Sequence, residues 1–190
     1  MRLFVALDID EAILQRLDDY VRTLMPRLPG VRFVRSNTYH VTLTFLGEVK
    51  RSEEVREHLR QVSSPGFSLS VGGVGFFPNE RAPRVFWAGI KSPALAGLAR
   101  DVGEALEPLG FPLEHDFHPH LTLARNGSGR RRPVRGERSP QAFRQLAQIV
   151  ASSPAPEFGT MTAREFFLYE SKLSSSGPNY SKLEAFALAA

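Results

Sequence analysis

One four-residue pattern occurs twice in this chain, as His40-Val41-Thr42-Leu43 and as His120-Leu121-Thr122-Leu123. In an extended strand, successive side chains point to opposite faces. Simple alternation in the first copy therefore places one set on the polar face: His40, Thr42 and Thr44. A strand of this kind buries its aliphatic face and presents imidazole and hydroxyl groups to a cleft. Because the pattern occurs twice, the sequence predicts an active site in which two histidines act as acid and base.

The duplication extends beyond these two strands. Phe4-Val5-Ala6-Leu7 matches Phe86-Trp87-Ala88-Gly89 at an offset of 82 residues, close to the offset of 80 between the histidines. Apolar residues recur every three or four positions at about 12–24 and 95–109, which predicts helices there. Further helices are expected after the histidine strands, at about 52–62 and 140–150. The chain is thus predicted to contain two copies of a βαββα unit, each followed by further strands and related by an approximate two-fold axis.

The composition indicates a globular protein. At 190 residues and 42% apolar content, the chain can form a substantial core, and we expect one bilobed domain over residues 1–190. No apolar run approaches the roughly 20 residues that cross a membrane, and Leu3–Leu7 is expected to be a buried strand. Cysteine is absent, which excludes disulfides, thiolate ligands and a cysteine nucleophile. We expect a cytoplasmic monomer.

The net charge of +4 comes from one segment. Between Arg125 and Arg138 there are six arginines and one acid, so the rest of the chain sums to −1. The segment begins five residues after His120, and its glycines and arginines predict a mobile loop that contacts phosphate. The alternative interpretation is a solvated basic loop.

Two other stretches are predicted to be turns. The glycine-rich run at 72–75 has no Lys-Ser/Thr after it, so it is not expected to be a phosphate loop. With Phe76–Asn79 it joins strands at 67–71 and 84–90, and we expect a bulged strand and a hairpin turn over this stretch. The run from Ser174 to Asn179 is expected to be a turn between strands at 165–171 and 182–188.

Two histidines without thiolates or paired carboxylates suit the cleavage of a phosphodiester. The unperturbed pKa of imidazole is near 6.5, so one neutral and one protonated ring can coexist near neutral pH. The neutral ring removes a proton from the nucleophile, and the protonated ring donates one to the leaving group. The hydroxyls of Thr42 and Thr122, with an arginine, can donate hydrogen bonds to the non-bridging oxygens. This chemistry needs no metal.

The remaining histidines allow other interpretations. A catalytic metal site remains an alternative interpretation for a cluster of three histidines with two possible oxygen ligands. Its members are His115, His118, His120, Glu114 and Asp116. A metal there leaves the matching His40 unexplained, so we expect neither a metal nor another cofactor. His58 lies among charged residues and is predicted to be an exposed helix residue. A purely structural role for both repeated histidines is the last alternative.

These residues resemble the 2H phosphoesterases, a superfamily named for two His-x-Thr/Ser-x motifs. Within it, the chain is similar to the RNA 2′,3′-cyclic phosphodiesterases, also called the 2′-5′ RNA ligase or LigT-like family. The resemblance rests on the following stretches: Arg2–Ala6, Tyr39–Glu48, Pro119–Arg125, Leu168–Ser171, Gly177-Pro178 and Tyr180. It implies an α+β fold in which two antiparallel sheets flank a central cleft and helices lie outside.

The resemblance also implies the site residues. The catalytic histidines and the hydroxyls that contact phosphate are, in this sequence, His40, His120, Thr42 and Thr122. The residues five positions after each histidine are Phe45, expected near the terminal base, and Arg125, expected at the phosphate. Simple alternation puts both on the opposite face from the histidines, so each strand must twist, bulge or end before them. Auxiliary RNA contact is expected from Arg130, Arg131 and Arg132.

The implied reaction is hydrolysis of a 2′,3′-cyclic phosphate at an RNA or nucleotide end. Water attacks phosphorus, the P–O3′ bond breaks, and a 2′-phosphate remains. His120 is assigned as the base for water and His40 as the acid for O3′, although the two roles can be exchanged. Two alternatives stay open: 2′-5′ RNA ligase activity on RNA halves, and a non-catalytic protein that binds RNA ends.

Overall fold

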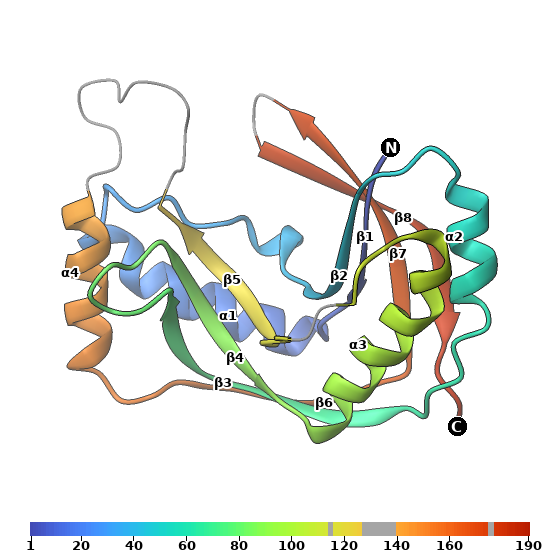
Figure 1. The fold of residues 1–190 in the computed structure, drawn as a ribbon. Helices are drawn as coiled ribbons and strands as arrows, with labels where there is room; N and C mark the ends of the chain where they lie inside the picture. The colour runs from blue at the N-terminus through green and yellow to red at the C-terminus, as the bar shows by residue number, and fades with distance from the viewer. Residues whose placement is uncertain (114–115, 127–139, 175–176) are drawn as a thin grey trace.

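The structure, a computed structural model, describes residues 1–113, 116–126, 140–174 and 177–190. Its strands form two four-stranded antiparallel sheets (Figure 1). The first, sheet A, has the spatial order β2 (Val41–Glu48), β1 (Arg2–Leu7), β7 (Glu165–Ser174) and β8 (Gly177–Ala187). The second, sheet B, has the spatial order β5 (His120–Arg125), β4 (Val85–Lys91), β3 (Phe67–Phe77) and β6 (Glu157–Ala163). Each histidine strand is therefore an edge strand of its own sheet.

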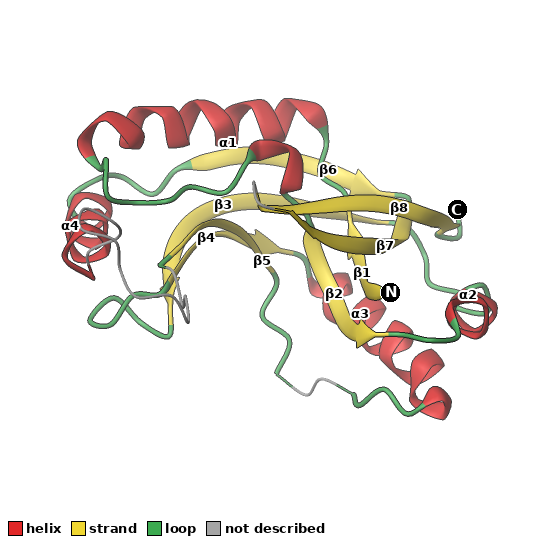
Figure 2. Cartoon of the chain, turned by 90° about the horizontal axis from the view of Figure 1, so that it is seen from above, coloured by secondary structure: helices red, strands yellow, loops and turns green. Residues whose placement is uncertain are grey.

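The helices lie outside the two sheets (Figure 2). They are α1 (Glu11–Leu24), α2 (Ser52–Leu59), α3 (Pro93–Leu106) and α4 (Pro140–Ala151), with short 3-10 turns at Met25–Arg27, Ser36–Thr38 and Glu107–Leu109. Helix α1 contacts β6, α3 contacts β2 and β3, and α2 contacts α3. In α1, Ile13, Leu17 and Val21 recur at helical spacing and are buried, so the apolar stripe fixes the helix against the sheet. None of the helices in the described ranges is long and apolar enough to span a membrane.

The predicted fold class is confirmed, and the predicted repeat unit is wrong in one detail. Each histidine strand is followed directly by one helix, giving β1-α1-β2-α2-β3 and β4-α3-β5-α4-β6. The segment after β2 is a short connection to α2, not the extra strand of a βαββα unit. The turn between the last two strands is also shorter than predicted, because β7 continues to Ser174 and β8 begins at Gly177.

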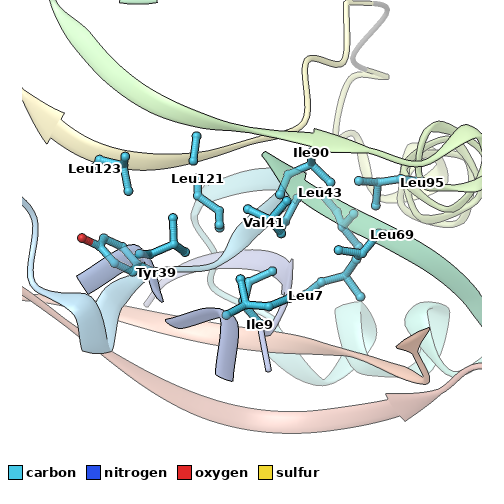
Figure 3. Close-up of a cluster of buried hydrophobic side chains, with 14 of the residues drawn as sticks. Leu7, Ile9, Tyr39, Val41, Leu43, Leu69, Ile90, Leu95, Leu121 and Leu123 are labelled. Atoms are coloured by element: carbon cyan, nitrogen blue, oxygen red, sulfur yellow. The ribbon is translucent and has the colours of Figure 1, made fainter. Parts of the chain in front are cut away.

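The aliphatic faces of the two histidine strands lie in one buried cluster (Figure 3). Val41 and Leu43 of β2 and Leu121 and Leu123 of β5 all belong to it. Strands β2 and β5 also contact each other directly. Burial of these side chains, at about 25 cal/mol for each Å² of apolar surface removed from water, therefore holds the two motifs side by side.

The glycine-rich run lies within β3. The pairing of β3 with β4 shifts register between Val71 and Val74, which confirms the predicted bulged strand. Gly73 adopts a φ of +68°, which favours glycine. A Cβ on Gly75 would lie 2.4 Å from the ring of Trp87, so only glycine lets the indole lie across the strand. These glycines serve the packing of sheet B.

Candidate active site

A bulge in β2 puts Phe45 on the same face as Thr42. Pairing with β1 skips Leu43: Ala6 pairs with Thr42, and the neighbouring Val5 pairs with Thr44. The extra residue resets the alternation, so Leu43 and Thr44 are both buried, whereas Phe45 is 64% exposed. Of the three predicted possibilities, that β2 twists, bulges or ends before Phe45, the structure has the bulge. Simple alternation was wrong for Thr44, which faces the core.

The same bulge occurs in β5. Pairing with β4 skips Leu123, because consecutive residues of β4 pair with Thr122 and Ala124. Leu123 and Ala124 are both buried, and Arg125 is exposed. The Nη2 of Arg125 donates a hydrogen bond of 3.4 Å to the hydroxyl of Thr122. The bulge therefore brings the arginine to the hydroxyl side of its strand.

Strand pairing also corrects the internal alignment of the two halves. Phe4 pairs with Phe45, and Val85 pairs with Arg125, so Phe4 is equivalent to Val85 at an offset of 81 (85 − 4). The predicted match of Phe4 with Phe86 was wrong by one residue. A slip of one residue exchanges the two faces of a strand. Phe86 accordingly lies in the main core, whereas Phe4 belongs to a separate cluster beside the cleft.

Each repeated histidine is held by the backbone carbonyl two residues before it. The Nδ1 of His40 lies 2.8 Å from the carbonyl oxygen of Thr38, and the Nδ1 of His120 lies 2.7 Å from that of His118. Because a carbonyl oxygen only accepts, Nδ1 carries the proton in each neutral ring. Each Nε2 is then free to accept a proton from a substrate when the ring is neutral, or to donate one when the ring is charged.

Aromatic rings enclose His40. Its ring centroid lies 4.8 Å from that of Phe4 and 5.1 Å from that of Tyr180, which meets it edge-on. Tyr169 lies 6.3 Å away. The Phe45 ring is 6.1 Å from Phe4, so it continues the same aromatic surface along β2. Sheet A therefore presents a histidine within an apolar wall.

The surroundings of His120 are different. Phe77 meets its ring edge-on at 5.0 Å, and Trp87 lies beside Phe77 at 5.2 Å. The guanidinium of Arg125 lies on this side and acts on the His120 ring. Sheet B thus provides positive charge where sheet A provides aromatic surface.

The pKa values of both histidines are lowered, and burial is the largest cause. Burial brings the pKa of His40 to about 4, against the opposing effects of its backbone hydrogen bond and the charge of Asp8. The charges of Arg125 and His120 lower the pKa of His40 further. Burial also lowers the pKa of His120, and Arg125 and His118 act in the same direction. Because Arg125 and His120 both act on the His40 ring, the three side chains lie near one another.

Some predicted residues cannot be placed in this cleft. Arg130, Arg131 and Arg132 lie outside the described residues, as do Glu114 and His115 of the alternative metal set. Among the residues that the structure describes, no three His, Asp or Glu side chains are grouped as a metal ion would require.

His58 is not the exposed residue that the sequence predicts. It is partly buried in α2, and its Nδ1 lies 2.7 Å from the carbonyl oxygen of Ala105 in α3. The charged residues around it in the sequence gave no sign of this contact, because the carbonyl belongs to a distant segment. His58 therefore connects two outer helices.

The chain matches the family described as LigT like Phosphoesterase over residues 7–87 and 90–180. It belongs to this family. Among curated relatives, a protein from Archaeoglobus fulgidus named RNA 2′,3′-cyclic phosphodiesterase is 38% identical, over 98% of this chain and 99% of its own length. A protein of the same name from Thermotoga maritima is 32% identical, over 96% of this chain and 93% of its own length. The predicted family is confirmed.

Solved structures agree with this membership. A Thermus thermophilus protein has a TM-score of 0.77 and 29% identity, covering 99% of this chain and 98% of its own. LigT from Escherichia coli in complex with ATP has a TM-score of 0.74 and 27% identity, covering 100% of this chain and 98% of its own. The same E. coli protein has also been solved with 3′-AMP. This LigT-like phosphoesterase therefore shares its fold with a protein that has been solved in complex with ATP and with 3′-AMP.

Sequence reasoning missed the neighbours of His40. Tyr169 and Tyr180 were part of the family resemblance but had no predicted role, because they come from β7 and β8, far along the chain. Phe4 and Asp8 could have been found from alternation along the first strand, once its register against the histidine strand was known. The one-residue error in the internal alignment hid that register.

Proposed function

We propose that this protein hydrolyses a 2′,3′-cyclic phosphate at an RNA or nucleotide end and leaves a 2′-phosphate. The observation that carries the proposal is the pair of histidines, each fixed through Nδ1 to a backbone carbonyl, in a cleft shared with Arg125. The family relatives from A. fulgidus and T. maritima bear the name of this activity, which supports the same assignment here.

In the proposed reaction, the Nε2 of His120 accepts a proton from water as the oxygen of that water forms a bond to phosphorus. The P–O3′ bond breaks, and the Nε2 of His40 donates its proton to the departing O3′. Thr42, Thr122 and Arg125 donate hydrogen bonds to the non-bridging oxygens, on which negative charge increases in the transition state. His120 then loses its proton to solvent, and His40 takes up a proton from solvent when the next anionic substrate binds.

The charges near each ring support this division of roles. Arg125 favours the neutral form of both rings, whereas the carboxylate of Asp8 favours the protonated form of His40. Burial nevertheless keeps the pKa of His40 at about 4, so the empty cleft holds two neutral rings near pH 7. The anionic phosphate of the substrate supplies the charge that raises the pKa of His40 and lets it act as the acid.

Phe45 is the proposed support for the terminal base. Its ring is largely exposed on the hydroxyl side of β2 and lies beside Phe4. An exposed aromatic ring can stack on a base of any identity, at about 1–3 kcal/mol per base. Sheet A would then hold the nucleoside, and sheet B, with Arg125, would hold the phosphate.

The test is to incubate the purified protein with adenosine 2′,3′-cyclic phosphate in EDTA and to identify the product by ³¹P NMR. We expect adenosine 2′-phosphate. Absence of turnover would leave the protein as a binder of RNA ends, and a 3′-phosphate product would contradict the proposed bond cleavage. Adding RNA with a 5′-hydroxyl and analysing the product linkage would detect the ligase alternative.

We further propose that the whole chain acts as one bilobed domain, because the main apolar cluster contains residues of both sheets. A monomer in the cytoplasm remains our expectation. Light scattering of the purified protein and fractionation of cells that express it would test the two statements separately.

A further inference from the structure

A cavity of about 280 Å³ adjoins His40 on sheet A. Four parts of the chain form it: the residues just after β1, helix α1, the segment just before β2, and the strands β7 and β8. The side chains that matter for its chemistry are Asp8, Asn37, Tyr39, Tyr169, Tyr180 and Lys182. His40 lines the same cavity, so a group bound there would contact the catalytic histidine.

The cavity is not the place of the reacting phosphate. Among the proposed phosphate contacts, only His40 lines it, while Thr42, Thr122 and Arg125 do not. Phe45 does not line it either, since that residue lies in the middle of β2 and the cavity adjoins the segment before the strand. The cavity is therefore a second subsite next to the cleft, separate from both the phosphate and the base expected on Phe45.

Its charges favour a neutral occupant. The carboxylate of Asp8 accepts a hydrogen bond from the hydroxyl of Tyr169 and forms an ion pair with Lys182. The ammonium of Lys182 also lies 3.9 Å from the centre of the Phe167 ring. The one anion and the one cation that line the cavity thus neutralise each other, so it has no net charge with which to hold a phosphate.

The walls suit a flat, polar ring. The hydroxyl of Tyr169 already donates to Asp8, so Tyr169 offers its ring, while burial raises the pKa of Tyr180 and keeps its hydroxyl a hydrogen-bond donor. Asn37 can both donate and accept. Single-stranded RNA is recognised by this combination, in which aromatic rings stack on a base and polar groups bond to its edges. The volume lies just below the roughly 300–1,000 Å³ of pockets for drug-sized ligands, which suits one base.

We propose that this cavity binds the base of the nucleotide on the 5′ side of the terminal cyclic phosphate. The proposal rests on the proposed function, because it takes the terminal nucleoside to lie on Phe45 with its phosphate between His40 and His120. The RNA chain continues from the 5′ oxygen of that nucleoside, and the cavity is the adjoining aromatic-lined space on the same sheet. The protein would therefore distinguish an RNA end from a cyclic mononucleotide through this base.

Binding of product-like ligands tests the proposal without turnover. The probes are adenosine 2′-phosphate, the dinucleotide ApA with a terminal 2′-phosphate, and the same dinucleotide with an abasic 5′ residue. We expect the full dinucleotide to bind roughly tenfold more tightly than the mononucleotide, as stacking of one base allows, and the abasic probe to lose that gain. Isothermal titration calorimetry measures all three affinities.

A blocking substitution checks the location. Asn37 is exposed at the mouth of the cavity, so Asn37→Trp should remove the dinucleotide gain and leave the mononucleotide affinity within about twofold of wild type. Gln61→Trp, which adds the same indole at an exposed position outside the cavity, should keep the gain.

Three results would each overturn the proposal. The wild-type protein could bind the two adenosine ligands equally, or the abasic probe could bind as well as the full dinucleotide, in which case the extra phosphate gives the gain. Asn37→Trp could also weaken the mononucleotide and the dinucleotide alike, in which case the terminal base occupies the cavity. If the tryptophan variant does not fold, the affinities of the wild-type protein for the full and the abasic dinucleotide still decide whether the 5′ base is bound. Turnover of the cyclic mononucleotide reports on the proposed function independently.

Discussion

Replacing His40 with asparagine should remove a pH dependence of folding stability that the wild-type protein carries. Burial lowers the pKa of His40 from 6.5 to about 4 in the folded protein. An asparagine side chain can still donate a hydrogen bond toward the carbonyl of Thr38, which His40 contacts through Nδ1, but it does not titrate. On unfolding in acid, the wild-type chain therefore takes up a proton at position 40, and the variant does not.

The sign follows from the two pKa values. Above pH 6.5 the imidazole is neutral in both the folded and the unfolded chain, and it does not change the free energy of unfolding with pH. Between pH 6.5 and about 4, the unfolded chain binds a proton that the folded chain does not, so the free energy of unfolding falls as the pH falls. A shift of this size corresponds to about 3 kcal/mol. That is a large part of the 5–15 kcal/mol by which domains are typically stable.

Urea denaturation at several pH values between about 7.5 and about 4 gives the free energy of unfolding of both proteins. Carboxylates also titrate in this range, so the informative quantity is the difference between wild type and His40→Asn. We expect wild type to lose about 3 kcal/mol relative to the variant on going to the acid end. Parallel curves for the two proteins would refute the buried, neutral state of His40. Histidine NMR supplies a direct check: the His40 pKa should rise when inorganic phosphate enters the cleft.

Further predictions concern turnover of adenosine 2′,3′-cyclic phosphate. His40→Ala and His120→Ala should each cost about 10²–10⁴ in rate, and near-normal turnover in either variant would remove the paired assignment. His58→Ala should keep full turnover while urea denaturation shows a loss of about 1 kcal/mol, because one helix-to-helix hydrogen bond is removed. Turnover should persist in EDTA with a bell-shaped pH profile, and loss in EDTA restored by a divalent ion would contradict the mechanism. Arg125→Ala should impair cyclic mononucleotides and RNA ends alike, with partial recovery in Arg125→Lys, whereas normal turnover in Arg125→Ala would place the reacting phosphate elsewhere.

The sequence and the family resemblance together located the two histidine strands and required each to twist, bulge or end before the residue five positions after its histidine. The reasoning was geometric: Phe45 and Arg125 lie an odd number of positions after their histidines, so strict alternation cannot put them on the histidine face. The structure has the extra residue at Leu43 and at Leu123. A conflict between strand periodicity and an expected role thus predicted a feature of the backbone.

What the sequence could not provide is the partner strand of each motif. The match of Phe4 with Phe86 looked better by residue type than its true equivalence with Val85, and hydrogen-bond register is not visible in a sequence. Tyr169 and Tyr180 reach His40 only because β7 pairs with β1 and β8 pairs with β7. Contacts of this kind depend on pairing between distant segments, which local patterns do not encode.

The two motifs are nearly identical, yet the proposed chemistry needs one acid and one base, so the difference has to come from their surroundings. With the corrected register, Asp8 is equivalent to Gly89, which pairs with His120, and Phe45 is equivalent to Arg125. Beside its histidine, one lobe thus has the carboxylate of Asp8, where the other lobe has a glycine without a side chain. After its bulge, the first lobe has the ring of Phe45, where the other has the guanidinium of Arg125. In the proposed reaction, Asp8 favours protonation of His40, Arg125 attracts the phosphate toward sheet B, and Phe45 leaves sheet A with an apolar surface for the base. A symmetric backbone with two unequal positions in each lobe is therefore sufficient to give the cleft a direction.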